Sequence, residues 1–252
     1  IACNDHTVML KNDGTVWACG WNNYGQLGLG DTTNRNTFTK VTNDVKQVAC
    51  GRFHTFIIKN DGSLWTCGDN EYGQLGLGDN TNRNTFTQVT TNINNDVKQV
   101  ICGWWYTFIV KNDGSLWSCG ANDDGQLGLG SGGNRNTFTK VTTNVSDVKQ
   151  VVCGCRHTFI LKNDGSVWSC GDNYHGQLGI GTSDYDSHNT FAKVTTNISN
   201  VKEIVCGSDH TIILKNDGSL WSCGDNSQGQ LGLGDTTNRT TFTKITTNVS
   251  DV

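Results

Sequence analysis

The chain of 252 residues has no proline and a single methionine, but it has 31 glycines. Turns normally use both proline and glycine, so Asn, Asp, Thr and Gly must form the turns of this protein. No apolar run reaches the ~20 residues that cross a bilayer. The N-terminus also lacks the charged and then apolar layout of a signal peptide. We therefore expect a soluble protein without a membrane partner.

A surplus of basic residues is also missing. The chain has 19 Lys and Arg against 23 Asp and Glu, a formal net charge of −4, and both signs are scattered along it. Proteins that bind nucleic acids usually carry a basic stripe that neutralises phosphates. We therefore expect no nucleic-acid partner.

Five copies of a long repeat fill the sequence. The stretch at residues 17–30 returns at 65–78, 117–130, 168–181 and 221–234. An Asp-Gly pair precedes each copy, and its aspartates, spaced by 48, 52, 51 and 53 residues, are Asp13, Asp61, Asp113, Asp164 and Asp217. A fixed period of this length is typical of solenoids, propellers and arrays. Because such repeats share interfaces, we predict one domain over residues 1–252.

Each repeat contains four short segments with strand character, and no stretch has a helical period. In the second repeat these segments are residues 37–41, 45–50, 54–59 and 63–67. Residues 54–59, and 211–214 in the fifth repeat, are continuously apolar in the middle, which predicts strands covered on both faces. Asn-Asp-Gly at residues 60–62 predicts a hairpin turn, because Gly takes the positive φ that closes it. This interpretation is favoured over a metal site built on Asp61.

A four-stranded antiparallel meander repeated around an axis is a propeller blade. The fold class that we predict is therefore all-β, a β-propeller of four-stranded blades from five repeats of about 50 residues. The chain begins and ends within the second segment of a repeat. We expect the strands at residues 1–3 and 250–252 to pair and close the ring, so that one blade is made from both ends.

Ten of the eleven cysteines end either the second or the fourth segment of a repeat. They are Cys3, Cys50, Cys102, Cys153 and Cys206, and Cys19, Cys67, Cys119, Cys170 and Cys223. One strand separates the two kinds, which places them ~9–10 Å apart, whereas a disulfide needs Cα atoms within roughly 7 Å. We predict buried free thiols and a reducing, cytoplasmic location. Cys155 lies in a loop and is expected to be exposed.

Four histidines share one repeat position, which Tyr106 occupies in the third repeat; they are His6, His54, His157 and His210. A hydrogen bond that caps each histidine's own blade is favoured over a ring of metal ligands. The Gly-Gln-Leu-Gly segment is a turn and not a phosphate loop, because no helix follows it. No catalytic set stands out from the repeats. We predict no enzyme activity, no cofactor and no metal.

The residues that mark the repeat are, in its second copy, Val45, Val48, Cys50-Gly51, His54-Thr55, Asp61-Gly62, Trp65, Cys67-Gly68, Asn70 and Gly73-Gln74-Leu75-Gly76. This pattern covers essentially the whole chain and resembles the repeat of the regulator of chromosome condensation family, the RCC1-like propellers. The resemblance implies an exchange factor for a small GTPase, an interaction module of a larger protein, or a secreted β-lactamase inhibitor. Family members usually have seven blades. The five repeats are thus a five-bladed variant or part of a larger or assembled ring.

Two loops differ between repeats that are otherwise nearly identical, and a meander places both loops at the same end of a blade. Their variable positions carry aromatic and arginine residues, which anchor protein interfaces. We predict a protein-binding face centred on Arg52, Phe53, Trp104 and Trp105. In full it comprises Trp21, Tyr24, Arg52, Phe53, Tyr72, Trp104, Trp105, Arg156, Tyr174 and His175. The alternative is drift after duplication, with some aromatic rings packed against neighbouring blades.

These observations predict a protein–protein interaction scaffold with an unidentified protein partner. Three alternatives stay open: a guanine-nucleotide exchange factor, an inhibitor of an enzyme, and an architectural repeat that self-associates through its terminal strands.

Overall fold

A computed structural model describes residues 1–93, 96–196 and 198–246. Within these ranges the chain forms strands, turns and loops, and no helix. The part of the chain that the structure describes accordingly offers no helix able to cross a membrane. The strands build five separate four-stranded antiparallel sheets, which confirms the all-β prediction.

The contacts divide the chain into two compact units. The first consists of residues 1–121 and 134–141, and the second of residues 122–133 and those from 142 onward. The first unit contains three sheets. The first sheet is β1–β4 (Ala2–Cys3, His6–Leu10, Val16–Gly20, Arg35–Thr42), and the second is β5–β8 (Val45–Cys50, His54–Lys59, Leu64–Gly68, Arg83–Gln88). The third sheet is β9–β12 (Val97–Cys102, Tyr106–Lys111, Leu116–Gly120, Arg135–Lys140). The sheets of the second unit are β13–β16 (Val148–Cys153, His157–Lys162, Val167–Gly171, His188–Lys193) and β17–β20 (Val201–Cys206, His210–Lys215, Leu220–Gly224, Arg239–Lys244). The prediction of a single domain stays a prediction.

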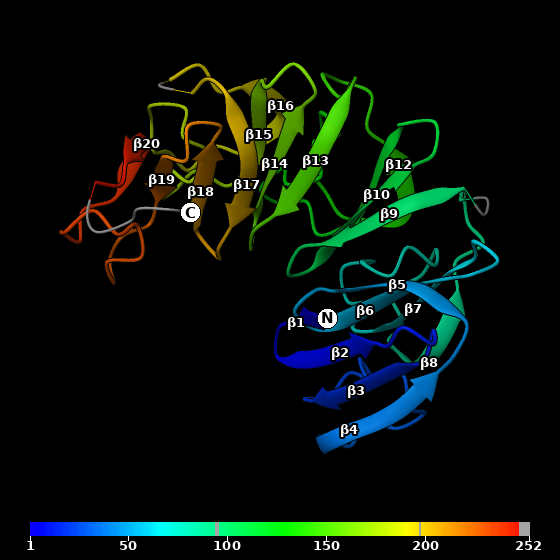
Figure 1. The fold of residues 1–252 in the computed structure, drawn as a ribbon. Coiled ribbons are helices and arrows are strands. Elements are labelled where there is room, and N and C mark those ends of the chain that lie inside the picture. Colours follow the sequence, from blue (N-terminus) through cyan, green and yellow to red (C-terminus); the bar gives the residue numbers. More distant parts are fainter. Residues whose placement is uncertain (94–95, 197, 247–252) are drawn as a thin grey trace. The chain divides into compact units, whose positions relative to one another are not determined.

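Each sheet is one continuous stretch of chain, and its strands lie side by side in sequence order, as β1 to β4 do in Figure 1. The segment around residues 37–41 therefore ends the first sheet, and the prediction that it opens the sheet of residues 45–50 was wrong. The long loop after β3 causes this, because Asn22 folds it back: its Oδ1 accepts the Leu27 N–H (2.9 Å), and its Nδ2 donates to the Asp31 carbonyl (3.0 Å). The returning chain pairs with β3, where Trp17 lies opposite Lys40.

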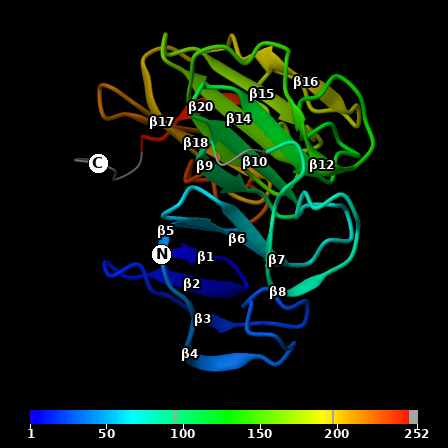
Figure 2. The ribbon, with the colours of Figure 1, turned by 90° about the vertical axis from the view of Figure 1, so that its right-hand side faces the viewer.

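The expected blade made from both chain ends was also wrong, because residues 2–42 complete the first sheet by themselves (Figure 2). A two-residue link, in which Asp44 takes a φ of 61°, leads from β4 directly into β5 of the next sheet. The predicted pairing of residues 1–3 with 250–252 involves positions outside the described residues.

The Asn-Asp-Gly segments form the predicted hairpin turns. Between β6 and β7, Gly62 has a φ of 86°, and its N–H donates to the Lys59 carbonyl (2.9 Å). The Asp61 carboxylate accepts both the backbone N–H and the hydroxyl of Ser63 (2.9 and 2.6 Å). These hydrogen bonds lower the pKa of Asp61. The carboxylate is thus committed to the turn.

The hydrophobic cores lie between neighbouring sheets of one unit. Val8 and Val16 of the first sheet, for example, pack with Val45 and Ile57 of the second. β6 is buried along nearly its whole length, as predicted for residues 54–59. β18 instead alternates between buried and half-buried residues, so the same prediction for residues 211–214 was wrong. The described residues cover one face of β18 and leave the other half-exposed.

The recurring Gly-Gln-Leu-Gly loop of one sheet packs against the outer strand of the following sheet. A Cβ placed on Gly25 would lie 2.3 Å from the Cα of Asn84, and one placed on Gly28 would lie 2.5 Å from the Phe86 ring. Glycine is required because the outer strand of the following sheet lies directly against the loop. The loop is a packing element, in keeping with its interpretation as a turn.

The cysteines lie where the repeat places them. Cys50 and Cys67 both stand opposite Thr55, one on each side of it in the sheet, and neither forms a disulfide. Cys155 is 7% exposed, so its predicted exposure was wrong. Its N–H donates to the Ser208 carbonyl (2.9 Å), which holds its loop against the corresponding loop of the next sheet. The reducing location stays a prediction.

Candidate protein-binding face

Seven of the ten residues predicted for the binding face come together in the first unit as one continuous group. We call this group the aromatic–arginine stack; it consists of Trp21, Tyr24, Arg52, Phe53, Tyr72, Trp104 and Trp105. The loops that follow β3, β5, β7 and β9 supply it, and they belong to three sheets. The prediction that these loops share one end of their sheets is confirmed by the contacts between them.

One end of the stack is a cluster of three rings. The Trp21 ring lies 5.5 Å from Tyr24 and 4.7 Å from Phe53, both nearly edge to face, and Tyr24 lies 5.4 Å from Phe53. Each such pair stabilises by roughly 0.5–1.5 kcal/mol beyond its buried area. Two sequence-distant loops are therefore fixed relative to each other at this point.

Arg52 occupies the centre of the stack. Its guanidinium carbon lies 4.7 Å from the Phe53 ring centre, 4.4 Å from Trp104 and 5.9 Å from Trp105. Trp105 continues the stack to Tyr72 at 6.3 Å. Cation–π contacts of this kind contribute roughly 0.5–2 kcal/mol each. The arginine thus joins the rings of two loops into one surface.

Hydrogen bonds fix the orientation of Arg52. Its Nε donates to the Asp5 carboxylate (3.2 Å), and its backbone N–H donates to the Trp104 carbonyl (3.3 Å). Within the described residues, neither Nη group has an acceptor, and the side chain is 33% exposed. The N–H donors of both Nη groups therefore stay available on a guanidinium that is already held in place.

The rings of the stack differ in exposure. Phe53 is buried at 9%, whereas Trp21, Tyr24, Trp104 and Trp105 are half-buried. Phe53 supports the surface from beneath and does not form part of it. The half-buried rings use part of their area against neighbouring loops, as the alternative of packed aromatics expected, and leave the remainder open to solvent.

The other three predicted residues lie in the second unit and form no comparable stack. Arg156 is exposed and pairs with Asp124 at 3.8 Å. The Tyr174 ring lies 4.6 Å from His175 and 4.7 Å from Tyr185. The structure thus brings Tyr174 and His175 together and gives Arg156 a separate partner.

Carboxylates surround these residues, and the sequence-based prediction did not include them. Burial raises the pKa of Asp124 and of Asp209, and repulsion from the negatively charged Asp172 raises the pKa of both groups further. His175 lies 3.8 Å from the Asp225 carboxylate. Asp124 and Asp209 stand at the variable loop positions, so the same comparison of repeats contained the signal for an acidic surface.

Three of the four recurring histidines, His6, His54 and His157, bond to a threonine of the neighbouring sheet, so the predicted cap within their own blade was wrong. Nε2 of His6 lies 2.7 Å from the Thr55 hydroxyl, and Nε2 of His54 lies 2.9 Å from that of Thr107. The Thr55 hydroxyl itself donates to the Gln26 carbonyl (2.7 Å), so His6 must be the donor in its own pair. Burial lowers the pKa of His6 to about 4 and that of His54 to about 3. Both rings are neutral at pH 7.

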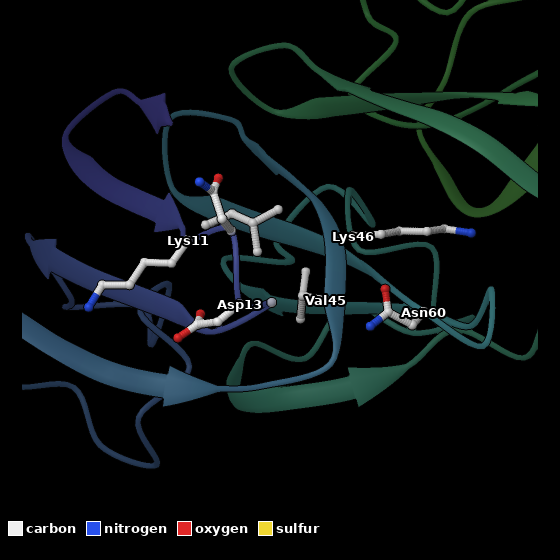
Figure 3. A pocket seen from close by; sticks show the side chains of 8 residues that line it. Lys11, Asp13, Val45, Lys46 and Asn60 are labelled. Carbon is white, nitrogen blue, oxygen red and sulfur yellow. The ribbon is translucent and has the colours of Figure 1, made fainter.

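A polar hollow lies at the hairpin end of the first two sheets. Figure 3 shows Lys11 and Lys46 on its border, with their side chains directed away from each other. The ammonium group of Lys11 lies 4.4 Å from the Trp17 ring centre. The Asp13 carboxylate accepts two hydrogen bonds from Thr15, at 2.9 and 2.6 Å. Lys11 and Asp13 are engaged by neighbouring residues of their own hairpin, and we assign no chemistry to this hollow.

The sequence profile of the Regulator of chromosome condensation (RCC1) repeat matches residues 13–58, 61–110, 113–161, 164–214 and 217–250. The chain is 37% identical over 151 residues to the X-linked retinitis pigmentosa GTPase regulator of the dog, which covers 57% of this chain and 15% of that protein. It is 34% identical over 242 residues to the Ultraviolet-B receptor UVR8 of Arabidopsis thaliana, which covers 96% of this chain and 44% of the receptor.

Among solved structures, yeast RCC1 (Prp20), crystallised with bound Kap60, matches with a TM-score of 0.87 at 20% identity. The match covers 97% of this chain and 60% of the yeast chain. At this identity the likeness concerns the fold alone, and it confirms the β-propeller architecture. The chain spans less than half the length of either curated relative.

Proposed function

Since the chain belongs to the family of Regulator of chromosome condensation (RCC1) repeat proteins, we propose that it is a protein-binding scaffold whose aromatic–arginine stack contacts the partner. The observation that carries this proposal is the stack itself, in which Arg52 joins rings from loops of neighbouring sheets. Nearly identical repeats hold these loops, and the loops differ in sequence from one repeat to the next. The strands of the repeats form a rigid scaffold, and the variable loops that this scaffold positions are available for recognition.

The stack is suited to a protein surface for two reasons. Its rings and its guanidinium are already fixed, so binding would cost little side-chain entropy. Trp, Tyr and Arg are also the residues that most often dominate interface energies. A planar guanidinium with its Nη groups available recognises carboxylates through two parallel hydrogen bonds. The proposed partner therefore presents an Asp or Glu side chain, with apolar groups beside it for Trp104 and Trp105.

Capture from a native extract tests this proposal. The wild-type chain, Arg52→Ala, Arg52→Lys and Trp104→Ala would be compared, with Arg83→Ala as the matched control. Arg83 also pairs with an aspartate, Asp79, at 2.6 Å, but it lies outside the stack. We expect one protein to be retained by the wild type and the control and lost by the other three variants.

With that protein purified, Trp104→Ala and Arg52→Ala should each weaken binding by about 2 kcal/mol or more, roughly thirtyfold in Kd. Arg52→Lys keeps the charge but loses the planar fork, so it should also weaken binding. Capture that is unchanged in all variants would contradict the proposal.

A second candidate is the regulation of a small GTPase, which the name of the canine relative favours. The compact loops of this chain carry no long insertion, and for that reason we place exchange activity below plain binding. Release of a fluorescent nucleotide from a panel of small GTPases tests it, and acceleration above the intrinsic rate would support it. The absence of an enzyme activity of the chain's own stays a prediction.

A further inference from the structure

The loop between β15 and β16 is longer than its counterparts in the other four repeats. Residues 181–188 form a stretch of eight residues where the others have six, as at residues 30–35. The starts of the two stretches correspond, because Nδ2 of Asn173 donates to a carbonyl near the start of the longer one (3.0 Å), as Nδ2 of Asn22 does in the first repeat (3.0 Å). Tyr185 stands in the additional length.

Tyr185 and Tyr174 form a pair of exposed aromatic rings, which we call the tyrosine pair. Tyr185 is 86% exposed and Tyr174 is 46% exposed, and their ring centres lie 4.7 Å apart. A hydrogen bond with the Tyr174 side chain raises the pKa of Tyr185. The His175 ring lies 4.6 Å from the Tyr174 ring on the side of the same loop. The two tyrosines are thus held together at the surface, although little of Tyr185 is buried.

The tyrosine pair is exposed even though its sheet has packing contacts on both sides within the second unit. On one side, the preceding loop at residues 122–133 packs on β16, where a Cβ placed on Gly125 would lie 2.7 Å from the Cα of Asn189. On the other side, a Cβ placed on Gly176 would lie 2.7 Å from a Cα atom of β20. The Ser187 hydroxyl also donates to a carbonyl of the preceding loop (3.0 Å). The contacts that bury the equivalent loops elsewhere are therefore present here, and they leave both rings open.

The loop is also the most acidic of the five. Residues 171–188 hold three aspartates and no Lys or Arg, which gives a net charge of −3. Each corresponding stretch of the other repeats holds one arginine, and the net charges are 0, −2, −1 and −1 at residues 20–35, 68–83, 120–135 and 224–239. His188 stands where those stretches end in arginine. The loop with the exposed rings is thus the one that lacks a permanent cation of its own.

Neutral donors hold the carboxylates of this loop. Asp172 accepts the backbone N–H of Tyr174 (3.1 Å) and the side-chain amide of Gln177 (2.7 Å). Asp184 accepts the Thr182 hydroxyl (2.9 Å). In the part of the chain that the structure describes, no Lys or Arg pairs with these two carboxylates or with Asp186. Their negative charge stays uncompensated beside the tyrosine pair.

We propose that the tyrosine pair binds an arginine side chain of a protein partner, and that the aspartates of the same loop balance its charge. A cation over a tyrosine ring is attracted by the electron-rich face of the ring. Because Tyr185 is so exposed, a ligand there keeps contact with water, which favours the weakly hydrated guanidinium of arginine over the strongly hydrated ammonium of lysine. The planar guanidinium can also lie flat on a ring while its edge donates to a carboxylate. This surface is independent of the aromatic–arginine stack, which is proposed to take a carboxylate and not a cation.

Fluorescence anisotropy with short labelled peptides tests this proposal. We expect a peptide of alternating arginine and glycine to bind the wild type at least about threefold more tightly than a peptide of alternating lysine and glycine. Tyr185→Ala and Tyr174→Ala should each weaken binding of the arginine peptide by about tenfold. Asp186→Asn should weaken it by about threefold. The matched control is Glu203→Gln, which removes the same charge from an exposed position in the middle of β17 and should leave binding unchanged.

Two further variants separate this surface from the rest of the molecule. Replacing residues 182–188 by the Asp-Thr-Thr-Asn-Arg of residues 31–35 should remove the preference for the arginine peptide, while circular dichroism should show that the fold is kept. Trp104→Ala should bind the peptide as the wild type does, so the proposed role of the stack can fail without affecting this result. Equal affinity for the two peptides would overturn the proposal. So would full binding by Tyr185→Ala, or a loss in Glu203→Gln as large as that in Asp186→Asn, because either result would mean that net charge alone attracts the peptide.

Discussion

The buried histidines should make the fold sensitive to acid, and His54→Tyr should remove a defined share of that sensitivity. Burial lowers the pKa of His54 to about 3, so its ring stays neutral in the fold, whereas an unfolded histidine takes up a proton near pH 6.5. The unfolded state then binds more protons as the pH falls, and the free energy of unfolding falls with it. The stability contributed by His54 is present above about pH 6.5 and is lost towards pH 3.

The size of the effect follows from these values. Between pH 7 and pH 5 the unfolded chain gains about 2 kcal/mol from protonating this one histidine, while the folded form gains almost nothing. The result hardly changes for any folded pKa at or below about 4, so it also applies to His6. The third repeat provides the replacement, because Tyr106 is fully buried at the equivalent position beside Gly103, as His54 lies beside Gly51.

Urea unfolding at pH 7 and at pH 5 measures the effect. The wild type should lose about 2 kcal/mol more than His54→Tyr between the two values, and a variant that also carries His6→Tyr should widen the difference to about 4 kcal/mol. Any packing cost of the tyrosine is present at both pH values and cancels. An equal loss in wild type and variant would show that His54 is protonated in the fold, and it would refute the reasoning.

Three further results are expected. Thr107→Val leaves the His54 N–H without its acceptor and should lower the free energy of unfolding by about 1–3 kcal/mol in urea; an unchanged midpoint would show that the pair contributes nothing. Phe138→Ala leaves a cavity beside Gly76 and should lower the free energy of unfolding by about 3–5 kcal/mol in the same assay, whereas a loss below about 1 kcal/mol would mean that the ring is not needed where the two sheets pack together. Burial raises the pKa of the Cys67 thiol, so a thiol reagent should label it in denaturant and not in the native protein, as peptide mapping would show.

The sequence predicted the local structure of this protein well. Each strand of the second repeat begins and ends within two residues of its predicted position, and the turn at Gly62 is the one expected from Asn-Asp-Gly. These features depend on neighbours in the chain: alternation of side chains along a strand, and the φ that glycine allows. The positions at which near-identical repeats differ also located the loops of the stack.

Other features depended on contacts that no single repeat contains. The sequence showed four strands in each repeat but not which strand opens a sheet, because Asn22 decides the path of the long loop through hydrogen bonds to residues 27, 31 and 33. It showed a histidine at a fixed position but not its partner, because Thr55 belongs to the neighbouring sheet. Cys155 was expected at the surface, since its contact with the loop at Ser208 is a property of two sheets together.

The sequence by itself determined that five similar sheets form and that the variable loops of each sheet lie at the same end of that sheet, because the strand period, the turn residues and the repetition are local features of the chain. The tertiary structure decided what those loops become. It placed Arg52 between Phe53 and Trp104 and placed Phe138 on Gly76, while Phe38 kept its surface exposed. Identical residues in successive repeats differ in this way because burial depends on which sheet lies next, and that neighbour is supplied by the packing of sheets and not by the repeat.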